Sequence, residues 1–422
     1  MKFKPHHLFL LLVILIPVVL RFLFPLTYHG FDVGTFEKWI PSTTPFYNVY
    51  ATDCYCNYPI IGLFLSTGVL KLVGSYFLFF LYLALFESFN ALLFYRLLGF
   101  FQVNNKWMYT LLFVSLPSTI SGGALWGQID HIGLTFLLIL LLIIAQIYQN
   151  NYPGKTTFRW HYLSIGVLFY LAIFTKQLLI FPLIPIGIAI LLILYGRKNL
   201  KEALFQFAIM LAGFLIPFLA FEAWLSYPDT YSLTHYQRIL ENGSDHMDII
   251  SGNGITIWQL FYHNLEHPST EKIIAFLSPK HIGLLLTFCF SSWLFFQYIK
   301  KSFLSGTVVF QIGLLCLVIA VFNLTFNLFL TGTHERYLFY FYPFLIIAFL
   351  GLRNQPGLFK PYDIILFFIG SIGYGLFVLA ILKGWLKVDN MHVNTIYHKF
   401  ITIGHLLIFT RLLFIVRKVG NS

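Results

Sequence analysis

Long apolar runs dominate the sequence, and short polar segments separate them. A helix needs about 20 mostly apolar residues to cross a hydrocarbon core of about 30 Å. Such runs predict twelve transmembrane helices, at 8–26, 76–98, 107–122, 131–148, 162–175, 178–196, 203–225, 281–299, 307–330, 338–352, 362–382 and 397–416. The run 162–175 is short and meets the next across Lys176 and Gln177, where we expect a tight hairpin. The pattern predicts an all-α membrane protein, with residues 1–422 forming one polytopic domain.

The composition narrows the class of protein further. Hydrophobic residues make up 58% of the 422 positions and charged residues only 10%, whereas an ordinary soluble domain carries roughly 25% charged residues. This balance excludes a cytosolic enzyme, a nucleic-acid binder and a disordered chain. The lipid bilayer is therefore the expected surrounding.

The distribution of charge predicts an orientation. With a cytoplasmic N-terminus and alternating spans, the cytoplasmic side and its helix ends hold 16 of the 27 basic residues. Only 3 of the 16 acidic residues lie on the cytoplasmic side or in the middle of a span, and the other 13 lie outside or at outer helix ends, so the inner side sums to +13 and the outer side to −2. This asymmetry follows the positive-inside rule. Both termini are expected in the cytoplasm, and the net charge of +11 requires no nucleic-acid partner.

Two long loops then fall on the outer side, at 27–75 and 226–280. We expect them to be ordered and to form the active-site face, because long loops in a compact protein usually carry function. The apolar run 59–72 within the first loop is short for a span, and Gly62 and Ser66 share one helical face there. We expect a helix at or dipping into the outer surface; a spanning helix stays open as the alternative.

Polar residues gather at the outer ends of the predicted helices in four groups. They are Asp32 within T-Y-H-G-F-D-V-G-T-F-E-K-W (27–39), W-G-Q-I-D-H (126–131), Lys176-Gln177, and T-H-E-R-Y (333–337). Each group has an ordinary structural explanation: a solvated helix cap, an interfacial aromatic belt, a snorkelling lysine and a surface ion pair. Together on one membrane face they suit a reaction on a sugar joined to a lipid phosphate.

Such a transfer needs a base for the acceptor hydroxyl and positive charge for the departing phosphate. Asp32 has Gly30 and Gly34 beside it, which let a substrate approach the backbone closely. Glu37 and Asp53 are rival bases, but the glycines favour Asp32. Lys176, Arg336 and His334 are candidates to hold the phosphate, since the planar fork of arginine suits phosphate oxygens.

The same motifs resemble the GT-C superfamily of polytopic membrane glycosyltransferases, closest to the bacterial and archaeal branch similar to GPI-anchor mannosyltransferases. The resemblance rests on Asp32 in the first outer loop followed by Tyr58-Pro59, on W-G-Q-I-D, on T-K-Q at 175–177 and on T-H-E-R-Y. The stretch S-G-N-G-I-T-I-W at 251–258 resembles an Asn…Trp motif of that branch. The resemblance to this family covers roughly residues 1–350.

The resemblance implies a GT-C-like fold with about twelve transmembrane helices and short interfacial helices. It implies inverting transfer of a hexose, mannose foremost, from a polyprenyl-phosphate sugar on the extracytoplasmic face. Asp32 would be the catalytic base, and Lys176, His334 and Arg336 would hold the donor phosphate. The sugar or acceptor would be lined by Trp126, Gln128, Asp130, Gln177 and Tyr58.

The chain departs from the family at two points. Ile60 follows Pro59, where the family often has a second proline, and no second acid adjoins Asp32. We therefore predict no metal and no cofactor, since the lipid-phosphate sugar is the donor substrate. The sugar, the acceptor (glycan, lipid or protein) and the membrane (plasma membrane in a prokaryote, endoplasmic reticulum in a eukaryote) stay open.

Two other functions are weighed against this one. A secondary transporter or lipid flippase with twelve spans usually joins two six-helix halves, but here the longest loop follows the seventh span. Glu87 is the clearest ionisable residue inside a predicted span, and a polar relay would need more. A structural membrane subunit is the other alternative, and it requires none of the outer-face groups.

Overall fold

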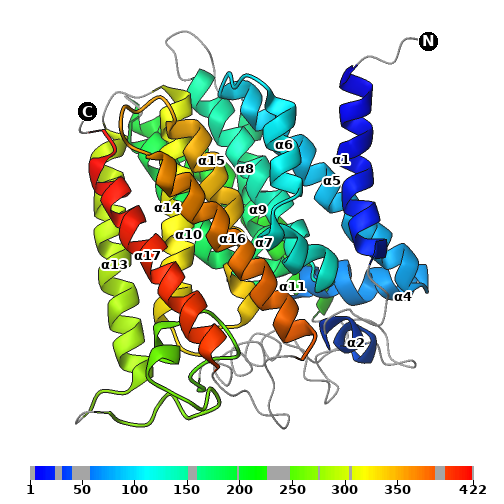
Figure 1. Cartoon of the computed structure of the whole chain (residues 1–422). Helices are drawn as coiled ribbons and strands as arrows, with labels where there is room; N and C mark the ends of the chain where they lie inside the picture. Colours follow the sequence, from blue (N-terminus) through cyan, green and yellow to red (C-terminus); the bar gives the residue numbers. More distant parts are fainter. Residues whose placement is uncertain are drawn as a thin grey trace. The chain divides into compact units, whose positions relative to one another are not determined.

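The computed structural model describes residues 5–23, 31–39, 58–150, 159–196, 199–225, 248–273, 276–303, 307–384 and 395–420. Within these ranges every regular element longer than a single β-bridge is a helix (Figure 1). Extended pairing there is limited to isolated bridges, of Ile249 with Pro268 and of His334 with Gly252 and Asn253. The predicted all-α class is confirmed for this part of the chain.

The first half of the chain contains α1 (Pro5–Leu23), α2 (Phe31–Lys38), α3 (Ile60–Leu63), η3 (Phe64–Gly68), α4 (Val69–Val73), α5 (Tyr76–Phe100), α6 (Lys106–Val114), α7 (Pro117–Ile120), η4 (Ser121–Leu125), α8 (Asp130–Asn150), α9 (Arg159–Thr175), η5 (Gln177–Leu179), α10 (Ile180–Tyr195) and α11 (Leu200–Leu225). The second half contains η6 (Ile257–Leu260), α13 (Pro279–Ser302), α14 (Val308–Phe329), η7 (Glu335–Tyr340), α15 (Phe341–Leu352), α16 (Pro361–Leu382) and α17 (Ile396–Lys418).

Nine of the described helices are long and apolar enough to cross a membrane. They are α5, α8, α10 with η5, α11, α13, α14, α15 with η7, α16 and α17. These helices indicate a multi-pass integral membrane protein. The apolar parts of α1 and α9 are helical but shorter, so the twelve predicted spans are not confirmed.

The predicted span at 107–122 is interrupted. Helix α6 ends at Val114, and α7 starts at Pro117 and continues into the π-helical turn η4. Proline has no backbone N–H and disfavours helical geometry in the residue before it, and Leu116 has a non-helical ψ of 124°. The apolar pattern of this run did not reveal the break, although Pro117 marks it.

The run 59–72 forms one helical segment, α3–η3–α4, with a π-helical turn in its middle. Ser66 Oγ donates a hydrogen bond to the carbonyl of Gly62 at 2.7 Å, which confirms that these residues share a face. Leu63 is fully buried, whereas Leu72 is 85% exposed. In Figure 1, α4 runs across the direction of α1. The surface location of this segment stays a prediction.

Contacts divide the chain into two compact units. The first contains α1–α5 and α8–α11, and α9 packs along α11 within it. A side chain at Gly166 of α9 would meet the backbone of Met210, and one at Gly213 of α11 would meet the backbone of Leu163. Small residues allow membrane helices to approach this closely, so these glycines fix the packing of α9 on α11.

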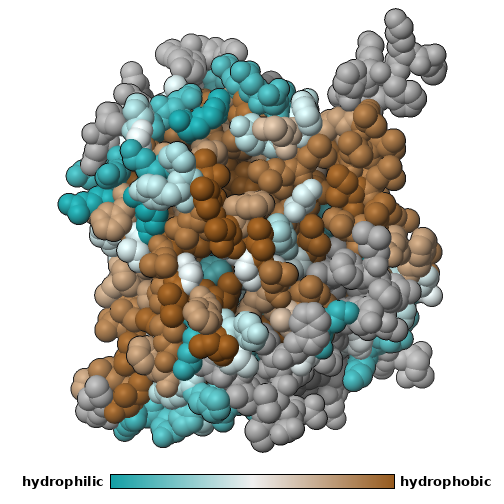
Figure 2. All heavy atoms as spheres, viewed as in Figure 1, coloured by the Kyte–Doolittle hydropathy of each residue, from teal (hydrophilic) through white to brown (hydrophobic). Residues whose placement is uncertain are grey.

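The second unit contains most of α6, then α7 with η4, and η6 with α13–α17. Its central helix is α14, which is buried along nearly its whole length and packs against α13, α15 and α17. Gly313 of α14 and Gly351 of α15 lie directly against each other. In Figure 2, hydrophobic side chains cover the middle of α16 and α17, as expected of helices that face lipid.

Candidate functional site

A buried ion pair lies at the start of α8. Lys176 Nζ is 2.9 Å from both carboxylate oxygens of Asp130, and the two side chains are 5% and 2% exposed. Gln128 Oε1 lies 3.4 Å from the same ammonium and accepts a hydrogen bond from the Tyr58 hydroxyl at 2.8 Å. The Lys176 ammonium also lies 5.9 Å from the centre of the Tyr58 ring. Four predicted site residues therefore meet in one buried group, which we call the Asp130–Lys176 site.

Local backbone geometry places this ion pair. Lys176 is extended, with φ −158° and ψ 131°, between the end of α9 and the start of η5, so it forms the short connection predicted there. On the other side, Gly127 has φ +75° and turns the chain after η4 into α8. A side chain at Gly127 would meet Val33 and Phe80. Glycine is needed here for both its conformation and its size.

The helix that carries Asp32 packs beside this site. Val33, Phe36 and Trp39 of the α2 segment belong to the same buried cluster as Tyr58 and Ile129. The Tyr58 ring lies 5.1 Å from Trp39 and 5.7 Å from Phe36. Thus α2 and the beginning of α8 share one core.

The structure describes the three candidate bases to different extents. Asp32 is the second residue of α2, but its side chain lies outside the described part, as does the whole of Asp53. Glu37 is exposed and accepts a hydrogen bond from the Tyr76 hydroxyl at 2.5 Å. The choice of Asp32 as base therefore stays a prediction.

The T-H-E-R-Y residues form a second polar group, within the second unit. The Arg336 guanidinium lies 5.7 Å from the Trp126 ring centre and 3.2 Å from Glu335 Oε1. His334 packs edge-on against Tyr337 at 5.1 Å. We call this set the Arg336 cluster; it brings together the predicted residues Trp126, His334 and Arg336.

The loop motif at 251–258 packs directly onto this cluster. The backbone N–H groups of Gly252 and Gly254 both donate to the carbonyl of Thr333 at 2.9 Å. A side chain at Gly252 would overlap the His334 ring. The glycines of S-G-N-G therefore let the loop hold His334 in place.

Gln177 is the least enclosed of the predicted site residues whose side chains the structure describes. It begins η5 and is exposed. The roles assigned to all nine site residues stay predictions, because their positions alone do not identify a ligand.

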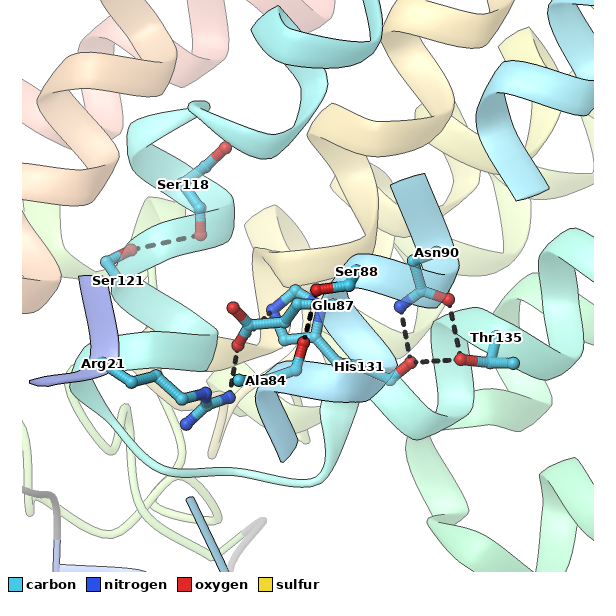
Figure 3. A network of polar contacts seen from close by, with 9 residues as sticks. All are labelled: Arg21, Ala84, Glu87, Ser88, Asn90, Ser118, Ser121, His131 and Thr135. Carbon is cyan, nitrogen blue, oxygen red and sulfur yellow. Dashed lines mark hydrogen bonds and ion pairs between the residues drawn. The ribbon is translucent and has the colours of Figure 1, made fainter. Parts of the chain in front are cut away.

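A third polar group is formed by side chains of α1, α5 and α8 (Figure 3), and of its members the sequence had singled out only Glu87. Arg21 Nη2 donates to Glu87 Oε1, and His131 Nε2 lies 3.4 Å from the same oxygen. Asn90 Nδ2 donates to the His131 carbonyl at 2.8 Å and its Oδ1 accepts from Thr135 Oγ1 at 2.7 Å. We call Arg21, Glu87 and His131 the Arg21 triad.

The triad is deeply buried. Arg21 is fully buried and Glu87 is 9% exposed, and no described residue accepts a hydrogen bond from Arg21 Nε or Nη1. Charges inside apolar runs signal functional sites in membrane proteins. Arg21 within the run 8–26 was therefore a usable signal, but its pairing with Glu87, 66 positions away, was not.

The Asp130–Lys176 site and the triad adjoin at the first two residues of α8. His131 lies level with Glu87, and about 16 Å of helix at 1.5 Å per residue separates Tyr76, the start of α5, from Glu87. Helix α8 thus begins part-way along α5. Both groups therefore lie part-way along α5, away from its first residue, Tyr76.

Across the described ranges, no group of three or more His, Cys, Asp or Glu side chains is arranged to hold a metal ion. A scan against protein-family models, a search of curated proteins and a search of solved structures found no match to the chain. Fold and composition define the class of this chain as a multi-pass integral membrane protein, with buried charged groups among its helices.

Proposed function

We propose that the protein is a membrane glycosyltransferase. It moves a hexose, mannose foremost, from a polyprenyl-phosphate sugar to an acceptor hydroxyl on the extracytoplasmic face, with inversion at the sugar carbon. The observation that carries the proposal is the buried Asp130–Lys176 ion pair, with Tyr58 and Gln128 beside it and α2 packed against the same core.

The chemistry of this site suits a sugar. A carboxylate accepts hydrogen bonds from hydroxyls, an ammonium donates to them, and an amide does both. Burying two charges costs several kcal/mol per ion before their attraction is counted. Ionisable residues among membrane helices commonly mark a functional site, and this supports a binding role for Asp130 and Lys176.

In the proposed reaction, Asp32 accepts the proton of the acceptor hydroxyl. The acceptor oxygen forms a bond to the sugar's anomeric carbon as the bond from that carbon to the phosphate oxygen breaks. The electron pair of the broken bond leaves with the lipid phosphate. Donors placed where negative charge develops lower the barrier of such a step, and Lys176, His334 and Arg336 are proposed to hold the phosphate.

Both proposed cations have carboxylate partners, Asp130 for Lys176 and Glu335 for Arg336. We therefore expect them to act through positioned N–H donors more than through excess positive charge. Trp126 stacks near Arg336 and, with Gln177, is proposed to line the sugar or acceptor. No metal and no cofactor are included, and the acceptor is a glycan, a lipid or a protein side chain.

The test compares membranes that contain the wild-type protein, Lys176→Gln or no protein. Lipid-linked and polymeric glycans are extracted and analysed by mass spectrometry. We expect a product heavier by one hexose only with the wild type. An identical set of glycoconjugates in all three membranes would overturn the proposal.

The Arg21 triad favours one second candidate, a secondary transporter or lipid flippase. The triad supplies Glu87 with two ionisable neighbours inside membrane helices, as a polar relay would require. Purified protein in liposomes separates the two functions. Solute uptake or lipid flipping that Glu87→Gln abolishes, without any glycosyl product, would support this candidate.

A further inference from the structure

A series of buried hydrogen bonds connects α17 with His334 of the Arg336 cluster, within the second unit. Thr402 of α17 donates from Oγ1 to Gln259 Oε1 at 2.8 Å. Gln259 Nε2 donates to the Gly254 carbonyl at 2.6 Å. The N–H of Gly254 in turn donates to the carbonyl of Thr333, the residue before His334. Figure 1 shows the loop that carries Gly254 and Gln259 beside the first turns of α17.

The chemistry of donors and acceptors fixes the orientation of the Gln259 amide. A backbone carbonyl only accepts hydrogen bonds, so Gln259 Nε2 faces Gly254 and Gln259 Oε1 faces Thr402, whose hydroxyl donates. Gln259 and Thr402 are both fully buried. Water therefore does not compete for either bond, and the low local dielectric strengthens them. We call these two side chains the Thr402–Gln259 link.

The other end of the series lies where the loop packs on His334. The Thr333 carbonyl accepts from the N–H groups of Gly252 and Gly254, each at 2.9 Å. Asn253, between the two glycines, has φ +65° and forms an isolated β-bridge with His334. Few residues other than glycine adopt this conformation, asparagine more often than most. The loop thus keeps an uncommon backbone conformation at its contact with His334, and a shift of Gly254 would alter that contact.

Helix α17 is exposed along one side. Phe400 and Ile403 are 67% and 45% exposed, whereas Thr402 between them is fully buried. Successive positions of a helix face different directions, so Thr402 faces inward on a helix whose outer side chains suit lipid. The Thr402–Gln259 link therefore connects a helix with one exposed side to the Arg336 cluster.

We propose that Gln259 and Thr402 are positioning residues for His334 and, through His334, for the phosphate of the donor lipid. They act through the loop, whose Gly252 lies against the His334 ring, and not by contact with the substrate. The part that concerns phosphate rests on the proposed glycosyl transfer. The positioning of His334 itself is testable without that reaction.

The first test measures the reactivity of the His334 ring in the full chain in detergent. Diethyl pyrocarbonate modifies histidine nitrogens, and peptide mass spectrometry gives the rate at each histidine. Thr402→Val removes the hydroxyl that donates to Gln259 with little change in volume. We expect the His334 rate, relative to His161 in the first unit, to rise at least about threefold, because the loop opens locally more often.

Two variants serve as controls, and thermal unfolding verifies that each folds. Thr402→Ser keeps the hydroxyl and should react as the wild type does. Thr410→Val removes a hydroxyl from an exposed position of the same helix, where Oγ1 donates to the Leu406 carbonyl at 2.9 Å, and should also leave the His334 rate unchanged. Gln259→Met, which removes the amide, covers the case that Thr402→Val fails to fold.

Transfer kinetics test the connection to the phosphate. Thr402→Val should lower kcat/KM for a polyprenyl-phosphate hexose by about fivefold, as expected for one lost buried hydrogen bond. In a His334→Ala background, where Lys176 and Arg336 still support measurable transfer, the same substitution should have no further effect. A purely structural role of Thr402 would lower kcat/KM by the same factor in both backgrounds.

Three results would overturn the assignment. One is a His334 rate in folded Thr402→Val equal to that of the wild type, and another is an equal rise in Thr410→Val. The third is an equal loss of kcat/KM with and without His334. If the wild type forms no glycosyl product, the proposed function fails, and the reactivity of His334 alone then decides whether the Thr402–Gln259 link positions it.

Discussion

Lys176 holds both carboxylate oxygens of Asp130 at 2.9 Å, across 46 positions of sequence and in a nearly solvent-free site. Lys176 lies between α9 and η5, and Asp130 is the first residue of α8, so the ion pair links these two parts of the chain. It therefore has a structural role as well as the proposed role in binding substrate, and substitutions can separate the two.

Removal of one partner should destabilise the protein strongly. Lys176→Met leaves Asp130 buried without its cation, which typically costs about 3–5 kcal/mol. We expect a large fall in the thermal unfolding temperature in detergent. The double variant Lys176→Met/Asp130→Leu should recover most of the stability and no transfer activity, whereas recovery of activity would exclude a role in substrate binding.

Loss of the hydrogen bond from Tyr58 to Gln128 should have a smaller effect on stability. Tyr58→Phe removes the hydroxyl donor at 2.8 Å and keeps the ring against Trp39 and Phe36. We expect a loss of about 1–2 kcal/mol in unfolding free energy. Transfer should fall through a raised KM for the sugar donor, measured with a synthetic polyprenyl-phosphate hexose; an unchanged KM would remove Tyr58 from the sugar site.

Gly127 should not tolerate a side chain. Gly127→Ala places an L-residue at φ +75° and against Val33 and Phe80, so we expect a loss of at least about 1–2 kcal/mol. Gly34→Ala is the matched control, since it lies within α2 with nothing near the added carbon. It should be neutral or stabilising by up to about 1 kcal/mol in the same unfolding assay. Equal losses in both variants would contradict this account of Gly127.

The Arg21 triad distinguishes the two candidate functions. The double variant Arg21→Gln/Glu87→Gln replaces two charges by two amides that are able to pair, so it should fold better than either single variant. A glycosyltransferase that uses the Asp130–Lys176 site should keep most of its transfer activity in this double variant. Complete loss of transfer in a well-folded double variant would place the triad in the reaction.

The sequence was most informative about single helices. The apolar runs for α5, α8, α11, α13, α14, α16 and α17 match the helices to within a few residues, because burial in lipid or protein demands a long apolar stretch. The run 107–122 was misleading because Leu116 and Pro117 break the helix inside an otherwise apolar pattern.

The sequence alone did not indicate which distant residues pair with each other. Asp130 and Lys176 were both predicted as site residues, but in separate roles, and nothing local in either motif encodes their ion pair. The same holds for Tyr58 with Gln128 and for Arg21 with Glu87, which lie 70 and 66 positions apart. Such contacts depend on how α1, α5, α8 and α9 pack, and single-chain periodicity does not specify that packing.

Asp32 of the first loop is the proposed base of glycosyl transfer at the membrane. The most direct test of this role is hexose transfer by Asp32→Asn, with Glu37→Gln as the control, in purified protein supplied with a polyprenyl-phosphate hexose and a membrane extract as the acceptor source. The product is followed by mass spectrometry, and thermal unfolding verifies that both variants fold. We predict that Asp32→Asn folds and forms no product while Glu37→Gln retains transfer; full transfer by folded Asp32→Asn would exclude Asp32 as the base.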